Sequence, residues 1–256
     1  GTLQTQCVAN PPIPVAKTWG GLVSYSGGNM NVSQGDYNNL TISGTTGSRT
    51  FTAGTTTVAG NFSLSTTTGV TTLAGDLDVN GNVTLAETGN TNSIFNPAGF
   101  NINVGGNWTV SSTGTSTALM NVVSTSLVTF DGAGTQTISR SSGTSLVPNF
   151  FNFRNSNTSS NPLDIVYNMT ISGDVTNDAS AILTIGTNTV TVGGSWANNG
   201  TFTANASTVN FTSGVAGKTL TGNMTGANKF NNITFNGLGT WTFAGNSADV
   251  GGNFRI

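Results

Sequence analysis

Residues 192–196 read Val-Gly-Gly-Ser-Trp, and related stretches recur along the chain. Close copies are Val-Gly-Gly-Asn-Trp at 104–108 and Val-Gly-Gly-Asn-Phe at 250–254, and weaker copies lie at 58–62 and 79–83. A motif that recurs at a regular distance constrains the architecture more strongly than any local secondary-structure prediction. The chain is therefore interpreted first as a repeat protein.

The repeat has a long period and a short one. Trp108 and Trp196 are 88 residues apart, which indicates a module of about 80 to 88 residues. The valines that open three earlier copies, Val58, Val79 and Val104, are only 21 and 25 residues apart. A unit of about 20 to 25 residues is too small for a domain but fits one coil of a solenoid.

Within each unit the residues alternate between apolar and polar. Examples are Val-Thr-Leu at 83–85, Ile-Asn-Val at 102–104 and Val-Thr-Val at 190–192. Alternation with period two places the apolar side chains on one face of a strand and Thr, Ser or Asn on the other. Asn-Gly pairs, such as those at 80–81 and 199–200, supply turns between the strands.

These patterns predict an all-β fold, a parallel β-solenoid of roughly eleven short coils. Residues 1–18 contain Asn-Pro-Pro-Ile-Pro at 10–14 and are expected to form an extended N-terminal arm, because proline does not fit a central strand. Residues 19–256 form the repeat-built domain, and 141–164, with two prolines, is expected to be a loop or a bulged coil. The alternative is a tandem array of immunoglobulin-like β-sandwiches.

Composition narrows the class of protein. Only 6% of the 256 residues are charged, and the formal net charge of −2 provides no basic patch for nucleic acid or an anionic membrane surface. No run approaches the ~18 apolar residues of a membrane-spanning helix. A Thr-, Asn- and Ser-rich surface with little charge is typical of secreted, extracellular or cell-surface proteins. Cys7, the single cysteine, is interpreted as an idle thiol, a link between chains or a lipid attachment site.

The chain offers little for catalysis. It has no histidine, and the closest pair among its nine acidic residues is Asp76 and Asp78. Two carboxylates on one strand face are able to bind calcium or flank a glycosidic bond, but a solvated face next to a turn explains them more simply. We therefore expect no enzyme activity, no catalytic residue, no metal site and no cofactor.

Aromatic and threonine residues raise two binding hypotheses. Trp108, Trp196, Trp241 and Phe254 are able to stack on sugars, but the shared repeat position of Trp108, Trp196 and Phe254 favours an internal stacked ladder. Threonine runs at 55–57 and 66–68 fall irregularly, whereas an ice-binding surface needs a flat, regular array of threonines.

Asn-x-Ser/Thr sequons are frequent, and the chain contains twelve of them. In a chain so rich in Asn and Thr many arise from composition alone, but surface sequons of a secreted protein are candidate glycosylation sites. The candidates are Asn39, Asn61, Asn82, Asn107, Asn168, Asn199 and Asn232.

Both ends of the repeat suggest contacts between molecules. No polar capping unit follows the copy at 250–254, so the chain is expected either to be part of a longer repeat protein or to have that end covered by a neighbouring molecule. Strand addition by an extended peptide is one way to cover such an edge, and the N-terminal arm is a candidate peptide. The expected polymerisation contacts are Val8, Ile13, Val15, Val250, Phe254 and Ile256.

The succession of Val-Gly-Gly-Ser-Trp-Ala-Asn-Asn-Gly-Thr-Phe-Thr, Thr-Val-Asn-Phe and Phe-Asn-Asn-Ile-Thr-Phe resembles the repeats of large secreted bacterial β-helix proteins, which are adhesin-like or fibre-forming. The resemblance covers about residues 30–256 and implies a cell-surface protein without assigned functional residues. The expected function is that of a structural subunit of a surface fibre, sheath or matrix that assembles head to tail as a homopolymer. The alternative is an adhesin module that binds glycans or other surface components.

Overall fold

The structure is a computed structural model, and it describes residues 1–89, 93–122, 125–143, 145–158, 160–244 and 247–256. The fold is a parallel β-solenoid of about 11 turns, as predicted. All the described strand pairings within each unit are parallel, which excludes immunoglobulin-like sandwiches because their sheets are antiparallel. The chain divides into two compact units: unit 1 is residues 1–126 with 140–148, and unit 2 is residues 127–139 with 149–256.

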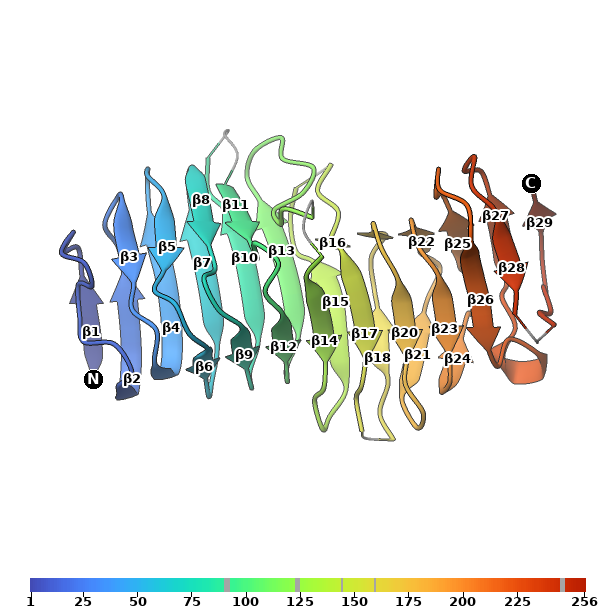
Figure 1. Ribbon diagram of the computed structural model, residues 1–256, viewed down its shortest axis with the longest axis horizontal. Coiled ribbons are helices and arrows are strands. Elements are labelled where there is room, and N and C mark those ends of the chain that lie inside the picture. Colours follow the sequence, from blue (N-terminus) through green and yellow to red (C-terminus); the bar gives the residue numbers. More distant parts are fainter. Residues whose placement is uncertain (90–92, 123–124, 144, 159, 245–246) are drawn as a thin grey trace. The chain divides into compact units, whose positions relative to one another are not determined.

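Unit 1 winds through three sheet faces (Figure 1). One ladder runs β1–β2–β4–β7–β10–β13, a second β6–β9–β12, and a third β3–β5–β8–β11. The strands are β1 Thr2–Thr5, β2 Thr18–Tyr25, β3 Met30–Val32, β4 Asp36–Gly44, β5 Arg49–Phe51, β6 Thr56–Val58, β7 Phe62–Thr66, β8 Gly69–Thr72, β9 Leu77–Val79, β10 Val83–Glu87, β11 Ser93–Asn96, β12 Ile102–Val104 and β13 Trp108–Ser112.

Unit 2 also has three ladders: β14–β17–β20–β23–β26–β28, β15–β18–β21–β24 and β16–β19–β22–β25–β27–β29. Its elements are β14 Leu127–Phe130, β15 Gln136–Arg140, β16 Asn149–Phe150, β17 Asn152–Asn155, β18 Leu163–Ile165, β19 Met169–Ile171, β20 Val175–Asn177, β21 Ile182–Ile185, β22 Thr189–Val192, β23 Trp196–Asn198, β24 Thr201–Thr203, β25 Thr208–Phe211, β26 Lys218–Gly222, the short 3-10 helix η1 Gly226–Asn228, β27 Asn232–Phe235, β28 Trp241–Phe243 and β29 Phe254–Arg255.

The alternation seen in the sequence sets which side chains fill the interior. In β7 and β10 the first, third and fifth residues are buried and the two between them face outward. The inward residues stack from coil to coil, as in the column Leu40, Phe62, Val83 and Trp108. Each buried side chain of this size contributes roughly 1.5–3 kcal/mol of stability, so the stacked columns hold each unit together.

The Gly-Asn part of the motif forms a corner where successive coils are in close contact. A Cβ atom at Gly81 would lie 2.4 Å from the carbonyl oxygen of Gly60, so only glycine fits there. The Oδ1 atom of Asn61 accepts a hydrogen bond from the backbone N–H of Asn82 at 2.9 Å, and Oδ1 of Asn82 accepts one from Asn107 at 2.8 Å. Glycine lets the backbones approach, and asparagine then links the two coils.

The segment expected as an N-terminal arm is bound to unit 1 along part of its length. Residues 2–5 form β1, which pairs in parallel with residues 22–25 of β2. Farther along, the carbonyl oxygen of Ile13 accepts a hydrogen bond from Ser33 Oγ at 2.6 Å. The segment is extended at residues 2–5 and bends at 9–13 and 15–16, and these contacts tie it to the coil that follows it.

Residues 141–164 were expected to form a loop or a bulged coil, and they contain strands as well as connections, so they are not a loop along their whole length. They contain β16, β17 and the start of β18, which pair with the next coils of unit 2. The inward positions of β17 are Phe153 and Asn155, both fully buried. The prolines therefore lie between strands, and the alternation in Asn-Phe-Arg-Asn at 152–155 already indicates the strand.

Candidate assembly surface

Two strands of unit 2 present an open sheet edge. β28 pairs with β26 and β29 pairs with β27, and no other strand in the described part of unit 2 pairs with them. The outer edge of each therefore presents N–H and C=O groups that another strand is able to pair with.

Aromatic side chains gather beside this edge. The rings of Phe211 and Phe235 stack with centroids 5.0 Å apart and an interplanar angle of 14°. The rings of Trp241 and Phe254 lie 5.3 and 6.0 Å from Phe235. Phe243 is 38% exposed and Phe254 is 54% exposed, whereas Phe202, Phe211 and Phe230 of the preceding coils are buried. Among the described residues, the apolar column thus ends at a surface that no further strand covers, which we name the β28/β29 face.

Two apolar hollows lie on this face. One, of about 310 Å³, is lined by Phe235, Trp241, Phe243, Phe254 and Ile256 together with Gly237, Gly239 and Thr240. The other, of about 380 Å³, shares Phe243 and Phe254 and adds Ile233, Ser247, Ala248 and Val250. Both are open depressions, suited to receiving side chains of another coil.

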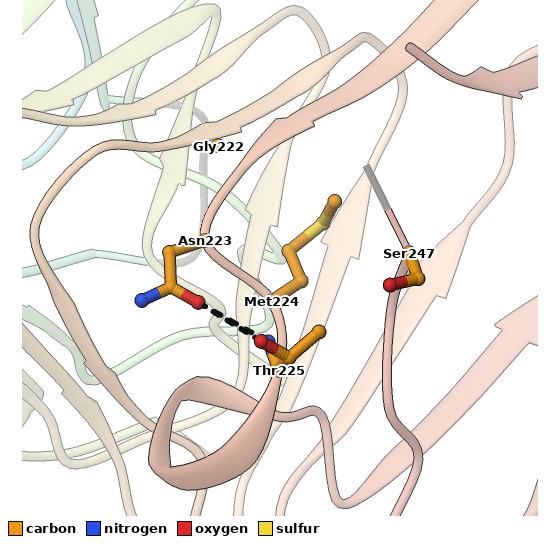
Figure 2. A pocket seen from close by; sticks show the side chains of 5 residues that line it. All are labelled: Gly222, Asn223, Met224, Thr225 and Ser247. Carbon is orange, nitrogen blue, oxygen red and sulfur yellow. Dashed lines mark hydrogen bonds between the residues drawn. The ribbon is translucent and has the colours of Figure 1, made fainter. Parts of the chain in front are cut away.

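A third, more polar hollow of about 310 Å³ lies nearby (Figure 2). Its lining is Gly222, Asn223, Met224, Thr225 and Ser247. Asn223 Oδ1 accepts hydrogen bonds from the backbone N–H of Thr225 at 3.3 Å and from its hydroxyl at 3.4 Å. This lining contains no ionisable side chain, so it provides no general acid or base.

The expected polymerisation contacts fall into two groups. In unit 2, Phe254 and the 90%-exposed Ile256 lie on the β28/β29 face, and Val250 is half-buried in an isolated bridge to Phe230. In unit 1, Val8 and Val15 are exposed, while Ile13 is half-buried. The Cys7 thiol is also exposed and accepts a hydrogen bond from the N–H of Ala9 at 3.4 Å.

The sequence predicted that Trp108, Trp196 and Phe254 stack in one internal ladder. The two tryptophans are indeed buried, but Phe254 does not belong to the same ladder. Trp108 and Trp196 are each 1% exposed and belong to the interior of unit 1 and unit 2, respectively. Phe254 does not share the position of Trp196, because Phe254 pairs with Ile233 of β27, whereas Trp196 pairs with Leu220 of β26. The last copy of the motif therefore lies on a different sheet, and the amino-acid sequence of the motif alone does not show this.

The sequons follow from the coil geometry. Asparagine at the corner is followed by an inward apolar residue and then by an outward Thr or Ser, as in residues 61–63 and 82–84. The Oδ1 atoms of Asn39, Asn61 and Asn82 accept hydrogen bonds from the next coil, and those of Asn168 and Asn232 do the same. Asn107 follows the same pattern on β13, and Asn199 is exposed. Glycosylation at these positions stays a prediction.

The acidic pair does not form a two-carboxylate site. Asp76 lies in a turn, where its Oδ1 accepts a hydrogen bond from the N–H of Asn101 at 2.8 Å, while Asp78 faces outward from β9. In the part of the chain that the structure describes, no three His, Cys, Asp or Glu side chains come together as a metal-ion site.

Sequence reasoning missed an amide ladder inside unit 2. Asn155, Asn177 and Asn198 are fully buried. Asn155 Nδ2 donates to Asn177 Oδ1 at 2.8 Å, and Asn177 Nδ2 donates to Asn198 Oδ1 at 2.7 Å. Their spacing of 22 and 21 residues, which equals one coil, was the available signal.

Comparisons with protein-family models, curated proteins and solved structures find no significant match to this chain. Among the described residues no helix has both the length and the apolar character needed to cross a membrane.

Proposed function

We propose that this protein is an extracellular, non-enzymatic structural subunit that assembles head to tail into a fibre, sheath or matrix at a cell surface. The observation that carries the proposal is the β28/β29 face, where an apolar column and a strand edge are uncovered together. A coil of a second copy would continue both the hydrogen bonding and the apolar packing of the sheet. A contact between two different surfaces of one chain gives an open filament when its rotation does not close into a ring.

Coil-on-coil stacking is better supported than donation of a free arm. Residues 2–5 already pair with β2 as β1, so they are not a free peptide. The inward-facing Leu3 of β1 is 37% exposed, because no described strand covers the other side of that coil. The first coil of one copy therefore offers a strand edge with the partly exposed Leu3, against which the β28/β29 face of another copy would pack.

The test is electron microscopy of the purified 256-residue protein, followed by one substitution. Filaments are expected for the unchanged protein, and Phe254→Asp should abolish them by placing a carboxylate in the apolar contact. Val166→Asp is the matched control, because Val166 is similarly exposed at 51% but directly follows β18, away from the β28/β29 strands. Single particles from the unchanged protein, or equal loss with both variants, would contradict the proposal.

The alternative proposal, a glycan-binding adhesin, has less support. Stacking on sugars requires exposed rings, and Trp108 and Trp196 are buried while Trp241 is only partly exposed. Binding on a glycan array that is lost in Trp241→Ala, with folding intact, would favour the adhesin over the structural subunit.

A further inference from the structure

A regular polar surface of unit 2 lies on the ladder β19–β22–β25–β27–β29. Two outward columns run across its strands. One contains Thr170, Thr191, Asn210 and Thr234, and the other contains Asn168, Thr189, Thr208 and Asn232. We name these eight residues the Thr/Asn grid.

The grid is regular because the coils pair in register. Thr191 aligns with Thr170 on one side and with Asn210 on the other, and the pairings carry no bulge. Neighbouring strands in a sheet are about 4.8 Å apart, and alternate residues of a parallel strand are about 6.6 Å apart. The polar groups are therefore fixed on a two-dimensional lattice, although the members of each column are 19 to 24 residues apart in the chain.

The side chains of the grid are short and mostly half-buried, and the Oδ1 atom of Asn210 is buried, so the groups offered to water are chiefly the threonine side chains. Threonine is stiff at χ1 because it is β-branched. Asn168 Oδ1 accepts a hydrogen bond from the N–H of Thr189 at 2.8 Å, and Asn232 Oδ1 accepts one from the N–H of Asn253 at 2.8 Å. Side-chain ladders of this kind also favour a flat sheet over a twisted one. The face therefore presents its groups with little conformational freedom to lose on binding.

The chemistry of the grid selects a neutral, ordered partner. Its eight members carry no charge, and Arg255 stands at its edge, aligned with Thr234. The aromatic residues of these strands, Phe211, Phe235 and Phe254, belong to the other face, where Phe211 and Phe235 stack on each other. An in-register array without charge or rings lacks the features that hold an ion or stack on a sugar. Threonine hydroxyls, methyl groups and amides at a fixed spacing fit an ordered layer of water.

We propose that the Thr/Asn grid binds ice. Water held at regularly spaced hydroxyl and amide groups would form a layer that merges with the surface of a growing crystal, while the threonine methyls exclude water between those groups. The threonine runs at 55–57 and 66–68 gave no regular array in the sequence. The grid instead assembles threonines from successive coils. Ice binding requires no contact between copies, so it stands apart from the proposed assembly.

The experiment measures thermal hysteresis and ice-crystal shape for the 256-residue protein and two lysine variants. Thr191→Lys places a long charged side chain in the middle of the grid. Thr184→Lys is the control, because Thr184 is a half-buried, outward residue of β21 on another ladder, between Asp164 and Thr203. Circular dichroism and the melting temperature establish that both variants fold.

Faceted crystals and measurable hysteresis are expected for the unchanged protein and for Thr184→Lys, and loss of both for Thr191→Lys. Thr191→Ser should retain part of the activity, since it keeps the hydroxyl and removes the methyl. Round crystals without hysteresis from the unchanged protein would overturn the proposal. Equal loss in both lysine variants would also overturn it, as would binding to an insoluble polysaccharide in the absence of any effect on ice.

Discussion

Each unit has an interior column of polar residues, and the two columns satisfy their hydrogen-bonding groups in different ways. In unit 1 this column contains Thr66, Glu87 and Ser112, all buried, at the ends of their strands. Glu87 Oε2 accepts a hydrogen bond from Ser112 Oγ at 2.5 Å, and Oε1 is buried without a partner. In unit 2 the column is the ladder of Asn155, Asn177 and Asn198.

The difference lies in what each side chain is able to donate and accept. An amide carries both a donor and an acceptor, so a column of asparagines satisfies itself from coil to coil. A mixed column of hydroxyls and one carboxylate has no such rule, and an oxygen is left over. A fully paired buried network also specifies the packing of a core, whereas a partly paired one weakens it. We therefore expect unit 2 to be the more rigid unit, and four predictions test that expectation.

The largest expected effect comes from the aromatic interior of unit 2. The ring of Trp196 lies 5.1 Å from Phe202 and 5.5 Å from Phe230. Trp196→Ala should destabilise unit 2 by about 3–5 kcal/mol, because it removes this packing and leaves a cavity. Hydrogen exchange of peptides from each unit measures the loss. Trp196→Phe is the matched control and should cost less, and equal losses from the two variants would argue against packing as the cause.

The second prediction concerns the buried asparagine ladder of unit 2 (Asn155, Asn177 and Asn198), which we call the inner ladder. Asn177→Leu removes the acceptor of Asn155 and the donor to Asn198 and to the carbonyl oxygen of Thr201. Each buried group left unpaired costs about 1–3 kcal/mol, so a total loss of about 3 kcal/mol or more is expected in a urea titration. The exposed neighbour Asn199 provides the control, since Asn199→Leu should change stability by less than about 0.5 kcal/mol. Similar losses of stability in the two variants would show that the ladder contributes no more than an exposed asparagine.

The third prediction concerns alkaline pH and unit 1. The Tyr37 hydroxyl donates to the carbonyl oxygen of Ser33, and it lies 2.9 Å from the hydroxyl of Tyr25, which accepts a hydrogen bond from the N–H of Ser33. Burial, reinforced by the hydrogen bond and charge of Tyr25, raises the pKa of Tyr37 far above its usual range. The folded state thus keeps a proton that the unfolded state releases near pH 10.

The raised pKa fixes the direction in which stability changes with pH. The contribution of Tyr37 to the stability of the folded state is complete below pH ~10 and is lost as the pH rises, by up to about 1.4 kcal/mol per pH unit. The asparagine amides of the inner ladder in unit 2 do not titrate, so peptides of unit 1 should begin to exchange faster at a lower pH than those of unit 2. Tyr37→Phe should flatten this dependence. If stability depends on pH equally steeply in that variant, a group other than Tyr37 causes the dependence.

These comparisons also explain how far sequence reasoning reaches. The spacing of Val58, Val79 and Val104 predicted the solenoid correctly, because one repeat of the sequence forms one coil. The side on which an asparagine lies was harder to predict, since Asn82 at a corner and Asn177 in the interior look alike in a list of residues. The position of Phe254 was missed for a related reason, because its motif copy is shifted onto another sheet. The Thr/Asn grid and the β28/β29 face depend on register across coils, which a single strand pattern does not contain.

The smallest expected effect separates the two kinds of ladder most sharply. A corner residue needs only an acceptor. In unit 2 the corner positions include Asn152, Asp174 and Ser195, whose oxygens each accept an N–H from the next coil at 2.9, 2.7 and 3.1 Å. Asn82→Ala should therefore cost about 1 kcal/mol, the value of one hydrogen bond, and Asn82→Asp should cost almost nothing.

The same change in the inner ladder should behave differently. Asn177→Asp keeps the acceptor but loses the donor, and it places a carboxylate oxygen against the buried oxygens of Asn198 and Thr201, so it should be nearly as harmful as Asn177→Leu. The test is a pair of urea midpoints for Asn82→Asp and Asn177→Asp. If aspartate is tolerated equally at both positions, donor and acceptor balance does not decide where this fold uses asparagine. If aspartate is tolerated only at the corner, asparagine has two distinct roles in one solenoid. The two roles then differ in the number of hydrogen-bonding groups that each position requires.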